Sequence, residues 1–203
     1  MKNLVIIGAS AMGRETCSYA CACGLHVKGF LDSRSHLLDD YIGYPPILGT
    51  VETYSPKSGD VFLCALGDPK QRKSYVEKII AKGGEFVSIV HPSAVVSENA
   101  KIGIGCVIRP MAVIGSDAII GAHVIVGTLS LVAHDCNVGD YSEISPGCHI
   151  AGWCNVGDEV FIGIHAALVP HVTLGKGVFV AAGAVVTKSV ESGRVMGVPA
   201  VRK

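Results

Sequence analysis

The second half of the chain carries hydrophobic residues at a strict period of six. From Ile102 to Val186 every sixth position is isoleucine, valine or leucine, without a gap. An α-helix repeats its apolar face every 3.6 residues and a half-buried strand every two, so neither element explains this period. A prism does explain it, if each face is one short strand, each corner is one turn and the aliphatic side chains point inwards. The pattern therefore predicts a parallel β-helix.

The period also predicts how the coils of this prism stack. Three six-residue units complete one coil of 18 residues, so residues 102–191 form about five coils, stacked roughly 4.8 Å apart. Glycine often follows the repeated aliphatic residue, as at Gly103 and Gly115. We expect it at tight corners because glycine tolerates positive φ. Residues 18 apart share a corner, which puts Gly152 one coil from His134.

The first half of the chain has a different pattern, in which apolar strands alternate with helical segments. The expected elements are strands at 2–7, 27–31, 60–66 and 85–90 and helices at 14–23 and 69–82. This alternation is typical of a parallel sheet with helical crossovers. We therefore predict a small Rossmann-like α/β domain over residues 1–90 and a β-helix domain over residues 91–203.

Composition narrows the classes of function. The 203 residues include 17 basic and 17 acidic side chains, so no charge excess favours nucleic acid or an anionic membrane as a partner. No apolar run approaches the length of a membrane span. The eight cysteines show no zinc-binding spacing, and the N-terminus lacks the pattern of a signal peptide. We expect reduced thiols, no metal and a cytoplasmic location.

A glycine-rich turn joins the first strand to the first helix. Gly8, Ser10 and Gly13 match the G-x-G-x-x-G fingerprint except at its middle position, and Asp32 stands where an acidic residue would meet a ribose hydroxyl. Backbone N–H groups at such a helix start bind phosphate. A turn that needs glycine only for packing is the alternative. The domain is too short for a full dinucleotide fold, which favours a nucleotide sugar over NAD(H).

Several short segments, in this order along nearly the whole chain, resemble one group of bacterial sugar acyltransferases. The group contains sialic acid O-acetyltransferase and UDP-4-amino-sugar N-acetyltransferase. The matching segments are residues 8–15, 30–32, 65–67 with Arg72, 91–94, 134–136, 151–152 and 197–200.

The resemblance implies a left-handed β-helix and a homotrimer with acetyl-CoA between adjacent β-helices. It assigns contacts with acetyl-CoA, largely through the backbone, to Gly152, Ile164 and Ala182. It assigns the nucleotide of the acceptor sugar to the first domain, with a site lined by Ser10, Ala11, Met12, Asp32, Ser33 and Gly67. The basic tail at residues 194–203 is a further candidate to meet the phosphates of CoA.

Two positions depart from this group. Relatives often carry histidine where Met12 stands, which leaves the base and the sugar open. They commonly carry a second histidine where Glu143 stands, near the thioester end of acetyl-CoA, so the resemblance places Glu143 among the residues that contact acetyl-CoA. An ionised glutamate only accepts hydrogen bonds, so Glu143 could not donate one to the thioester carbonyl. We expect it to orient His134, to contact the acceptor or to indicate weakened activity.

Among the eight histidines, His134 alone lies two positions after a repeated aliphatic residue, at a corner where Ala133 replaces the usual glycine. Asp135 follows it. Histidine suits a general base because its pKa is near neutrality. A solvated corner histidine is the alternative from spacing alone, whereas the resemblance assigns the base to His134 and the helper role to Asp135. The other repeat histidines, at 123, 165 and 171, are expected at the surface or in subunit contacts.

These observations predict an acetyl-CoA-dependent N-acetyltransferase that acts on a nucleotide-activated amino sugar. Transfer is direct, with His134 as general base and no covalent acyl-enzyme. A sialic acid or other sugar O-acetyltransferase is the first alternative. A non-catalytic nucleotide-sugar-binding scaffold is the second, favoured by Glu143.

Overall fold

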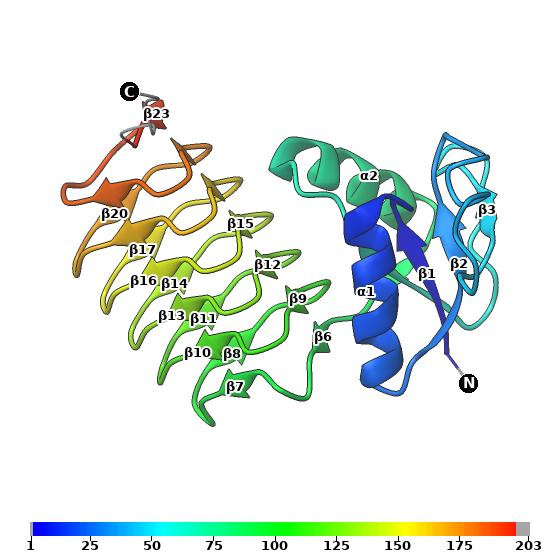
Figure 1. Ribbon diagram of the computed structural model, residues 1–203, viewed down its shortest axis with the longest axis horizontal. Helices are drawn as coiled ribbons and strands as arrows, with labels where there is room; N and C mark the ends of the chain where they lie inside the picture. Colours follow the sequence, from blue (N-terminus) through cyan, green and yellow to red (C-terminus); the bar gives the residue numbers. More distant parts are fainter. Residues whose placement is uncertain (1, 198–203) are drawn as a thin grey trace.

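The computed structural model describes residues 2–197, so residues 198–200 of the tail segment and the basic residues 202 and 203 lie outside it. The chain forms an α/β unit and a parallel β-helix that lie side by side (Figure 1). The fold class predicted from the hexapeptide pattern is confirmed.

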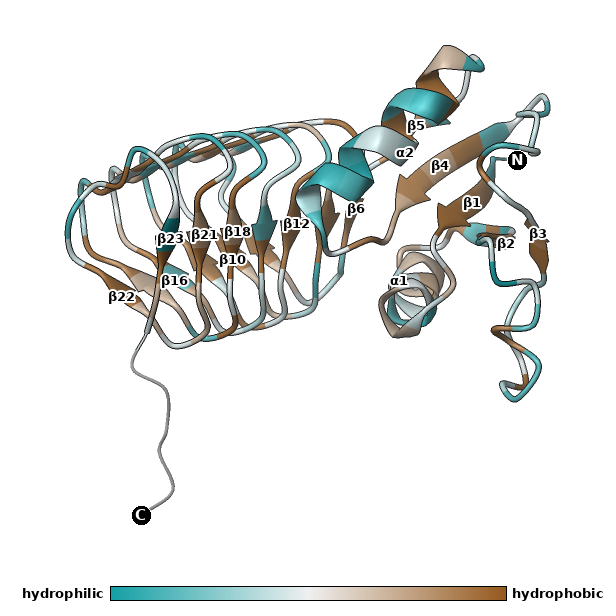
Figure 2. Cartoon of the chain, turned by 90° about the horizontal axis from the view of Figure 1, so that it is seen from above, coloured by the Kyte–Doolittle hydropathy of each residue, from teal (hydrophilic) through white to brown (hydrophobic). Residues whose placement is uncertain are grey.

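The α/β unit is built on one parallel sheet in the order β3-β2-β1-β4-β5. Its strands are β1 (Asn3–Ile7), β2 (His26–Leu31), β3 (Ile47–Gly49), β4 (Asp60–Cys64) and β5 (Glu85–Phe86). Helices α1 (Ala11–Ala22) and α2 (Pro69–Ala81) cover opposite faces (Figure 2). Alternate residues of β1 explain this arrangement, because Leu4 and Ile6 pack on the α1 side and Val5 and Ile7 on the α2 side.

Local sequence sets where both helices begin. Gly8 has a φ of +95°, and a side chain at Gly13 would collide with the carbonyl of Gly8, so the turn into α1 requires both glycines. At the start of α2, the carboxylate of Asp68 accepts a hydrogen bond from the N–H of Gln71 at 2.8 Å and Pro69 occupies the first turn. Both helix starts therefore lie at the carboxyl edge of the sheet.

The β-helix has three flat faces. Face 1 contains β6 (Ile89–Val90), β9 (Val107–Ile108), β12 (Ile125–Val126), β15 (Glu143–Ile144), β18 (Phe161–Ile162), β21 (Phe179–Val180) and β23 (Arg194–Val195). Face 2 contains β7 (Val95–Val96), β10 (Val113–Ile114), β13 (Leu131–Val132), β16 (His149–Ile150), β19 (Ala167–Leu168) and β22 (Val185–Val186). Face 3 contains β8 (Lys101–Ile102), β11 (Ile119–Ile120), β14 (Asn137–Val138), β17 (Asn155–Val156) and β20 (Thr173–Leu174). Within each face, residues 18 apart pair in parallel, as Val107 does with Ile125.

The predicted inward and outward positions are confirmed. From β7 to β23 the second residue of each strand points into the prism, and these aliphatic side chains form one continuous core. Four of the eight cysteines, Cys106, Cys136, Cys148 and Cys154, fill small inward positions as expected. Cys136 illustrates their hydrogen bonding, because its thiol lies 3.1 Å from the carbonyl oxygen of Ala151.

The reason for the repeated glycines differs from our expectation. Positive φ falls on the third residue of each corner, which is usually not glycine: Met111, Leu129 and Asp135 have values of 59°, 60° and 57°. The glycine after the aliphatic residue is instead a close-approach position. A Cβ on Gly103 would lie 2.6 Å from the carbonyl oxygen of Gly121 on the next coil. At Gly103 the close approach of the next coil, and not the turn conformation, favours glycine.

Face 1 of the β-helix packs against the α/β unit. The outward side chains of Ile89, Val107 and Ile125 join the apolar cluster that includes Leu4 and Cys17. Because Ile89 already pairs with Val107 inside the β-helix, the connection between the two units falls between β5 and β6. The division of the chain at residues 90 and 91 stays a prediction.

His123 lies in this interface and not at the surface, contrary to our expectation. Its ring is stacked on Tyr141 with 5.0 Å between centroids, and the edge of Phe86 meets it at 4.8 Å. Burial, together with the positive charge of Arg72, lowers the pKa of His123 to about 4. The imidazole is therefore neutral in the folded protein at neutral pH.

The low pKa predicts a loss of stability in acid that is specific to His123. Between about pH 6.5 and pH 4 the unfolded chain binds a proton at this residue and the folded chain does not, so the free energy of unfolding should fall by up to about 3 kcal/mol. His123→Asn keeps a residue that tolerates positive φ. Urea unfolding across this pH range should show a shallower slope for the variant, and equal slopes would contradict the assignment.

Candidate active site

His134 and Asp135 occupy a corner between faces 2 and 3. They lie between β13 and β14, and the N–H of Asp135 donates to the carbonyl of Ser116 on the preceding coil at 3.0 Å. This bond and the positive φ of Asp135 fix the corner. The structure thus brings together the two residues that the sequence proposed as base and helper.

The imidazole of His134 is held on three sides. Its Nδ1 lies 2.8 Å from Oδ2 of Asp135. Its ring is perpendicular to the ring of Trp153, with 4.5 Å between the two centroids. A Cβ on Gly152 would lie 2.5 Å from Cε1 and 2.7 Å from Nε2 of His134. An ionised Asp135 accepts from Nδ1–H, which leaves the lone pair of Nε2 to take a proton. The ring is half exposed, so a substrate can reach it.

The residues expected to hold acetyl-CoA lie along the two edges of face 2. Gly152 shares the corner of His134 one coil further on, as expected from the 18-residue period. Ile164 and Ala182 stack in the corner between faces 1 and 2, and both are exposed. His149 and Leu131 point outwards on the face between these corners. Face 2 therefore extends from the imidazole of His134 to the residues expected to contact acetyl-CoA.

Glu143 does not lie on this surface. It belongs to β15 on face 1, is 3% exposed and lies 3.0 Å from the guanidinium of Arg72. Burial raises the pKa of the Glu143 carboxyl, and the charges of Arg72 and Arg109 oppose that rise. The position corrects two of our expectations, because an enclosed carboxylate on face 1 cannot orient His134 or contact a cofactor on face 2.

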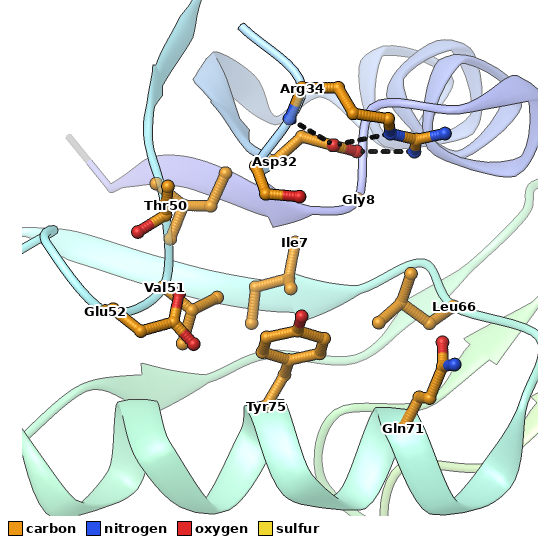
Figure 3. Close-up of a pocket in the computed structure, with 12 residues that line it drawn as sticks. Ile7, Gly8, Asp32, Arg34, Thr50, Val51, Glu52, Leu66, Gln71 and Tyr75 are labelled. Carbon is orange, nitrogen blue, oxygen red and sulfur yellow. Dashed lines mark hydrogen bonds and ion pairs between the residues drawn. The ribbon is translucent and has the colours of Figure 1, made fainter.

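A cavity of about 310 Å³ opens at the carboxyl edge of the sheet, between its strands and α2 (Figure 3). Its lining residues are Ile7, Gly8, Leu31, Asp32, Ser33, Arg34, Thr50, Val51, Glu52, Leu66, Gln71 and Tyr75. The strand order reverses next to β1, the usual place for a ligand in an open parallel sheet. Asp32 and Ser33, two predicted acceptor contacts, line this cavity, and their contact with a nucleotide stays a prediction.

Asp32 has two roles in this cavity. Its Oδ2 accepts from the N–H of Ala9 at 3.0 Å and so braces the glycine turn. Both oxygens also bind the guanidinium of Arg34 at 3.0 Å. Burial opposes ionisation of Asp32, but these hydrogen bonds outweigh it and hold its pKa below the usual value. An anionic carboxylate and an adjacent guanidinium thus border the cavity.

The other predicted acceptor residues are not part of the lining of this cavity. Ser10, Ala11 and Met12 form the first turn of α1, on the opposite side of the sheet edge. Met12 lies close to Gly67, since its Cε would be 3.2 Å from a Cβ there. These residues flank the same edge, so their contact with an acceptor stays a prediction.

Sequence reasoning missed several residues of the site. Arg34, Gln71 and Tyr75 line the cavity although no motif singled them out. In the sequence, the one feature that could have indicated them is position: Arg34 follows two residues after Asp32, and Gln71 and Tyr75 lie near the start of α2. The contact between Trp153 and His134 depends on stacking between coils.

Residues 2–197 contain neither a cluster suited to a metal ion nor a helix suited to cross a membrane. Within that range no cluster of three or more histidine, cysteine or acidic side chains is arranged to bind a metal ion. Neither α1 nor α2, nor any other helix in the described part of the chain, has the length and apolar character to cross a membrane.

Comparison with known proteins places both halves of the chain. Residues 3–79 match the family model of the PglD N-terminal domain, and residues 154–188 match the bacterial transferase hexapeptide model of six repeats. The acetyltransferase domain of PglB from Neisseria gonorrhoeae FA1090 is 32% identical over 97% of both chains, with a TM-score of 0.89. The chain belongs to the hexapeptide-repeat sugar acetyltransferase family.

Two further members of the hexapeptide-repeat sugar acetyltransferase family are informative. PerB from Caulobacter crescentus, solved with CoA and GDP-perosamine, is 30% identical over 100% of this chain and 98% of that chain, with a TM-score of 0.89. UDP-N-acetylbacillosamine N-acetyltransferase from Bacillus subtilis (strain 168) is 31% identical over 113 residues. That match covers 53% of this chain and 51% of the relative, so only about half of its length is compared.

The contact between Gly152 and His134 predicts that Gly152→Ala damages the site of this acetyltransferase without unfolding it. The added methyl would displace the ring, so we expect turnover to fall at least about tenfold, the scale of a misplaced catalytic group. Thermal unfolding should change by only a few degrees, because Gly152 lies at a corner. Normal turnover in a folded variant would show that the imidazole position is not important.

Proposed function

We propose that this protein transfers the acetyl group of acetyl-CoA to the amine of a nucleotide-linked amino sugar. The observation that carries the proposal is the His134–Asp135 pair in an exposed corner bordered by Gly152. The cavity at Asp32 supports a nucleotide-bearing acceptor, because it lies at the switch point of a parallel sheet. The complexes of PglB with acetyl-CoA and of PerB with CoA and GDP-perosamine support the donor and the acceptor class.

In the proposed mechanism the acceptor amine attacks the carbonyl carbon of the thioester. Nε2 of His134 accepts the proton that the amine loses, and the tetrahedral intermediate collapses with release of the CoA thiolate. The protonated imidazole then returns the proton to that sulfur. Asp135 keeps the ring oriented and stabilises its positive charge. The products are an amide and free CoA, with no acyl-enzyme.

The fold favours an active site shared between chains. Face 1 packs against the α/β unit of its own chain, whereas β13 and β14, the strands on either side of His134, belong to the other two faces (Figure 1). In a three-sided prism the corner of His134 is opposite face 1. The acceptor cavity of one chain therefore serves the imidazole of another copy.

Exposed apolar side chains support a homotrimer, the proposed assembly. Met111 and Leu129 stack in the corner between faces 1 and 2, Ile164 lies further along that corner, and Val113 and Val185 project from face 2. Exposed apolar side chains gathered on one side of a protein are typical of a subunit interface. This surface also adjoins Ala182, so contacts with acetyl-CoA from two chains would meet there.

All eight cysteines are unpaired, which supports a cytoplasmic location.

His134 variants test the chemistry. His134→Ala removes the base, so turnover should fall by at least about 100-fold. Asp135→Asn tolerates the same positive φ but removes the charge, and it should lower turnover by a smaller factor. Steady-state thiol release measures both. Near-normal turnover of a folded His134→Ala protein would exclude this residue as the base.

The acceptor is identified by one assay with a panel of compounds. CoA release from acetyl-CoA is measured with UDP- and GDP-amino sugars and with free and CMP-activated sialic acid. We expect release with an amino sugar. Release with sialic acid alone would establish O-acetylation instead, and nucleotide binding without release would establish a non-catalytic scaffold.

A mixing experiment tests the shared site. His134→Ala lacks the base and Asp32→Ala disrupts the acceptor cavity, so each homo-oligomer should be inactive. Oligomers reassembled from both variants combine an intact cavity with an intact His134 at some interfaces and should regain activity. Mixtures no more active than the parents would favour a site within one chain. Mixing His134→Ala with Asp135→Ala, which lie in the same corner, is the control and should restore none.

A further inference from the structure

Arg72 is enclosed where α2 meets the β-helix. Its side chain is 1% exposed, and its guanidinium is shared between the two units. Nη1 donates to the carbonyl of Leu66 and, at 3.0 Å, to Oε2 of Glu143. Nη2 donates to the carbonyls of Tyr141 at 2.6 Å and Ser142 at 3.0 Å. One side chain thus joins the turn after β4 to a coil of the β-helix.

That turn belongs to the rim of the acceptor cavity. Leu66 lines the cavity, and Gly67 is a predicted acceptor contact. Gln71, the residue before Arg72, lines it as well. The first turn of α2 therefore stands between the cavity and the β-helix, with Gln71 on one side and Arg72 on the other.

Glu143 provides the counter-charge for Arg72. A guanidinium removed from water is costly unless it is paired and hydrogen-bonded. The Glu143 carboxylate lies directly against it, on the strand that follows Tyr141 and Ser142. The planar guanidinium donates in several fixed directions, which a lysine ammonium does not reproduce.

We propose that Arg72, paired with Glu143, is a positioning residue that fixes the Leu66–Gly67 turn for the nucleotide of the acceptor. This inference rests on the proposed function, because it assigns the cavity to the acceptor. Arg72 touches no reacting atom. It lies on the face 1 side, opposite the corner of His134, so its loss should weaken acceptor binding and leave the donor site intact.

Three variants separate positioning from simple stability. Arg72→Lys keeps the charge beside Glu143 but cannot reach all four acceptors. The double variant Arg72→Met with Glu143→Leu removes both charges, which often leaves stability nearly unchanged. Lys73→Met is the matched control. Lys73 also joins α2 to the β-helix, through an ion pair with Glu159 at 2.8 Å, but it makes no bond to the turn.

Hydrogen–deuterium exchange of the free protein tests the link without any activity. Amides of residues 65–72 should exchange at least about tenfold faster in Arg72→Lys and in the double variant, because the turn opens locally. Lys73→Met should exchange as the wild type does. Unchanged exchange in both Arg72 variants would overturn the proposal, and Arg72→Lys provides the test if the double variant does not fold.

Kinetics test the consequence for binding. In the folded Arg72 variants the KM for the acceptor should rise at least about fivefold, while kcat and the KM for acetyl-CoA stay within about twofold. Faster exchange with an unchanged acceptor KM would overturn the positioning role. A wild-type protein that releases no thiol with any acceptor would instead refute the proposed function, and with it the acceptor role of the turn. The two failures are distinguishable, because one is an inactive wild type and the other is an active Arg72 variant with an unchanged acceptor KM.

Discussion

The parallel ladder of backbone hydrogen bonds between coils is the interaction on which the structure depends. Each strand pairs with residues 18 positions away, and each corner bonds to the next corner, as the N–H of Trp153 does to the carbonyl of His134 at 3.2 Å. Because this spacing does not drift, side chains far apart in sequence become neighbours along one edge. The proposed catalytic constellation needs no loop of its own, since Gly152 follows His134 in one stack and Trp153 is the next residue of that corner.

The same regularity produces a rigid partner for the α/β unit. Face 1 presents Val107 and Ile125 to the apolar cluster below α1 and presents Glu143 to Arg72 below α2. A single flat surface thereby supports both helices that follow the carboxyl edge of the sheet. The cavity at Asp32 and the proposed base lie on opposite sides of face 1, which supports the proposal that one site is shared between chains.

The hexapeptide period predicted the β-helix, its inward residues and the contact between Gly152 and His134, because each of these depends only on spacing. It did not predict which side chains lie between the units. Whether Glu143 faces solvent, cofactor or α2 depends on where the α/β unit docks, and spacing carries no information about docking. His123 was misjudged for the same reason. The cavity was predicted only at Asp32 and Ser33, since Arg34, Gln71 and Tyr75 reach it through the tertiary arrangement of the sheet and α2.

The third corner residue has a consequence for protein engineering. Ten residues other than glycine hold positive φ there, and such a backbone costs an ordinary side chain roughly 1 kcal/mol. Asparagine relieves part of that cost, but Met111 and Leu129 lie in the proposed subunit interface and Glu159 pairs with Lys73, so a gain in melting temperature there would be set against a lost contact. Asp135 and Trp153 occupy the same strained position beside the imidazole. At these two positions a substitution that relieves the backbone strain would also remove a contact with His134.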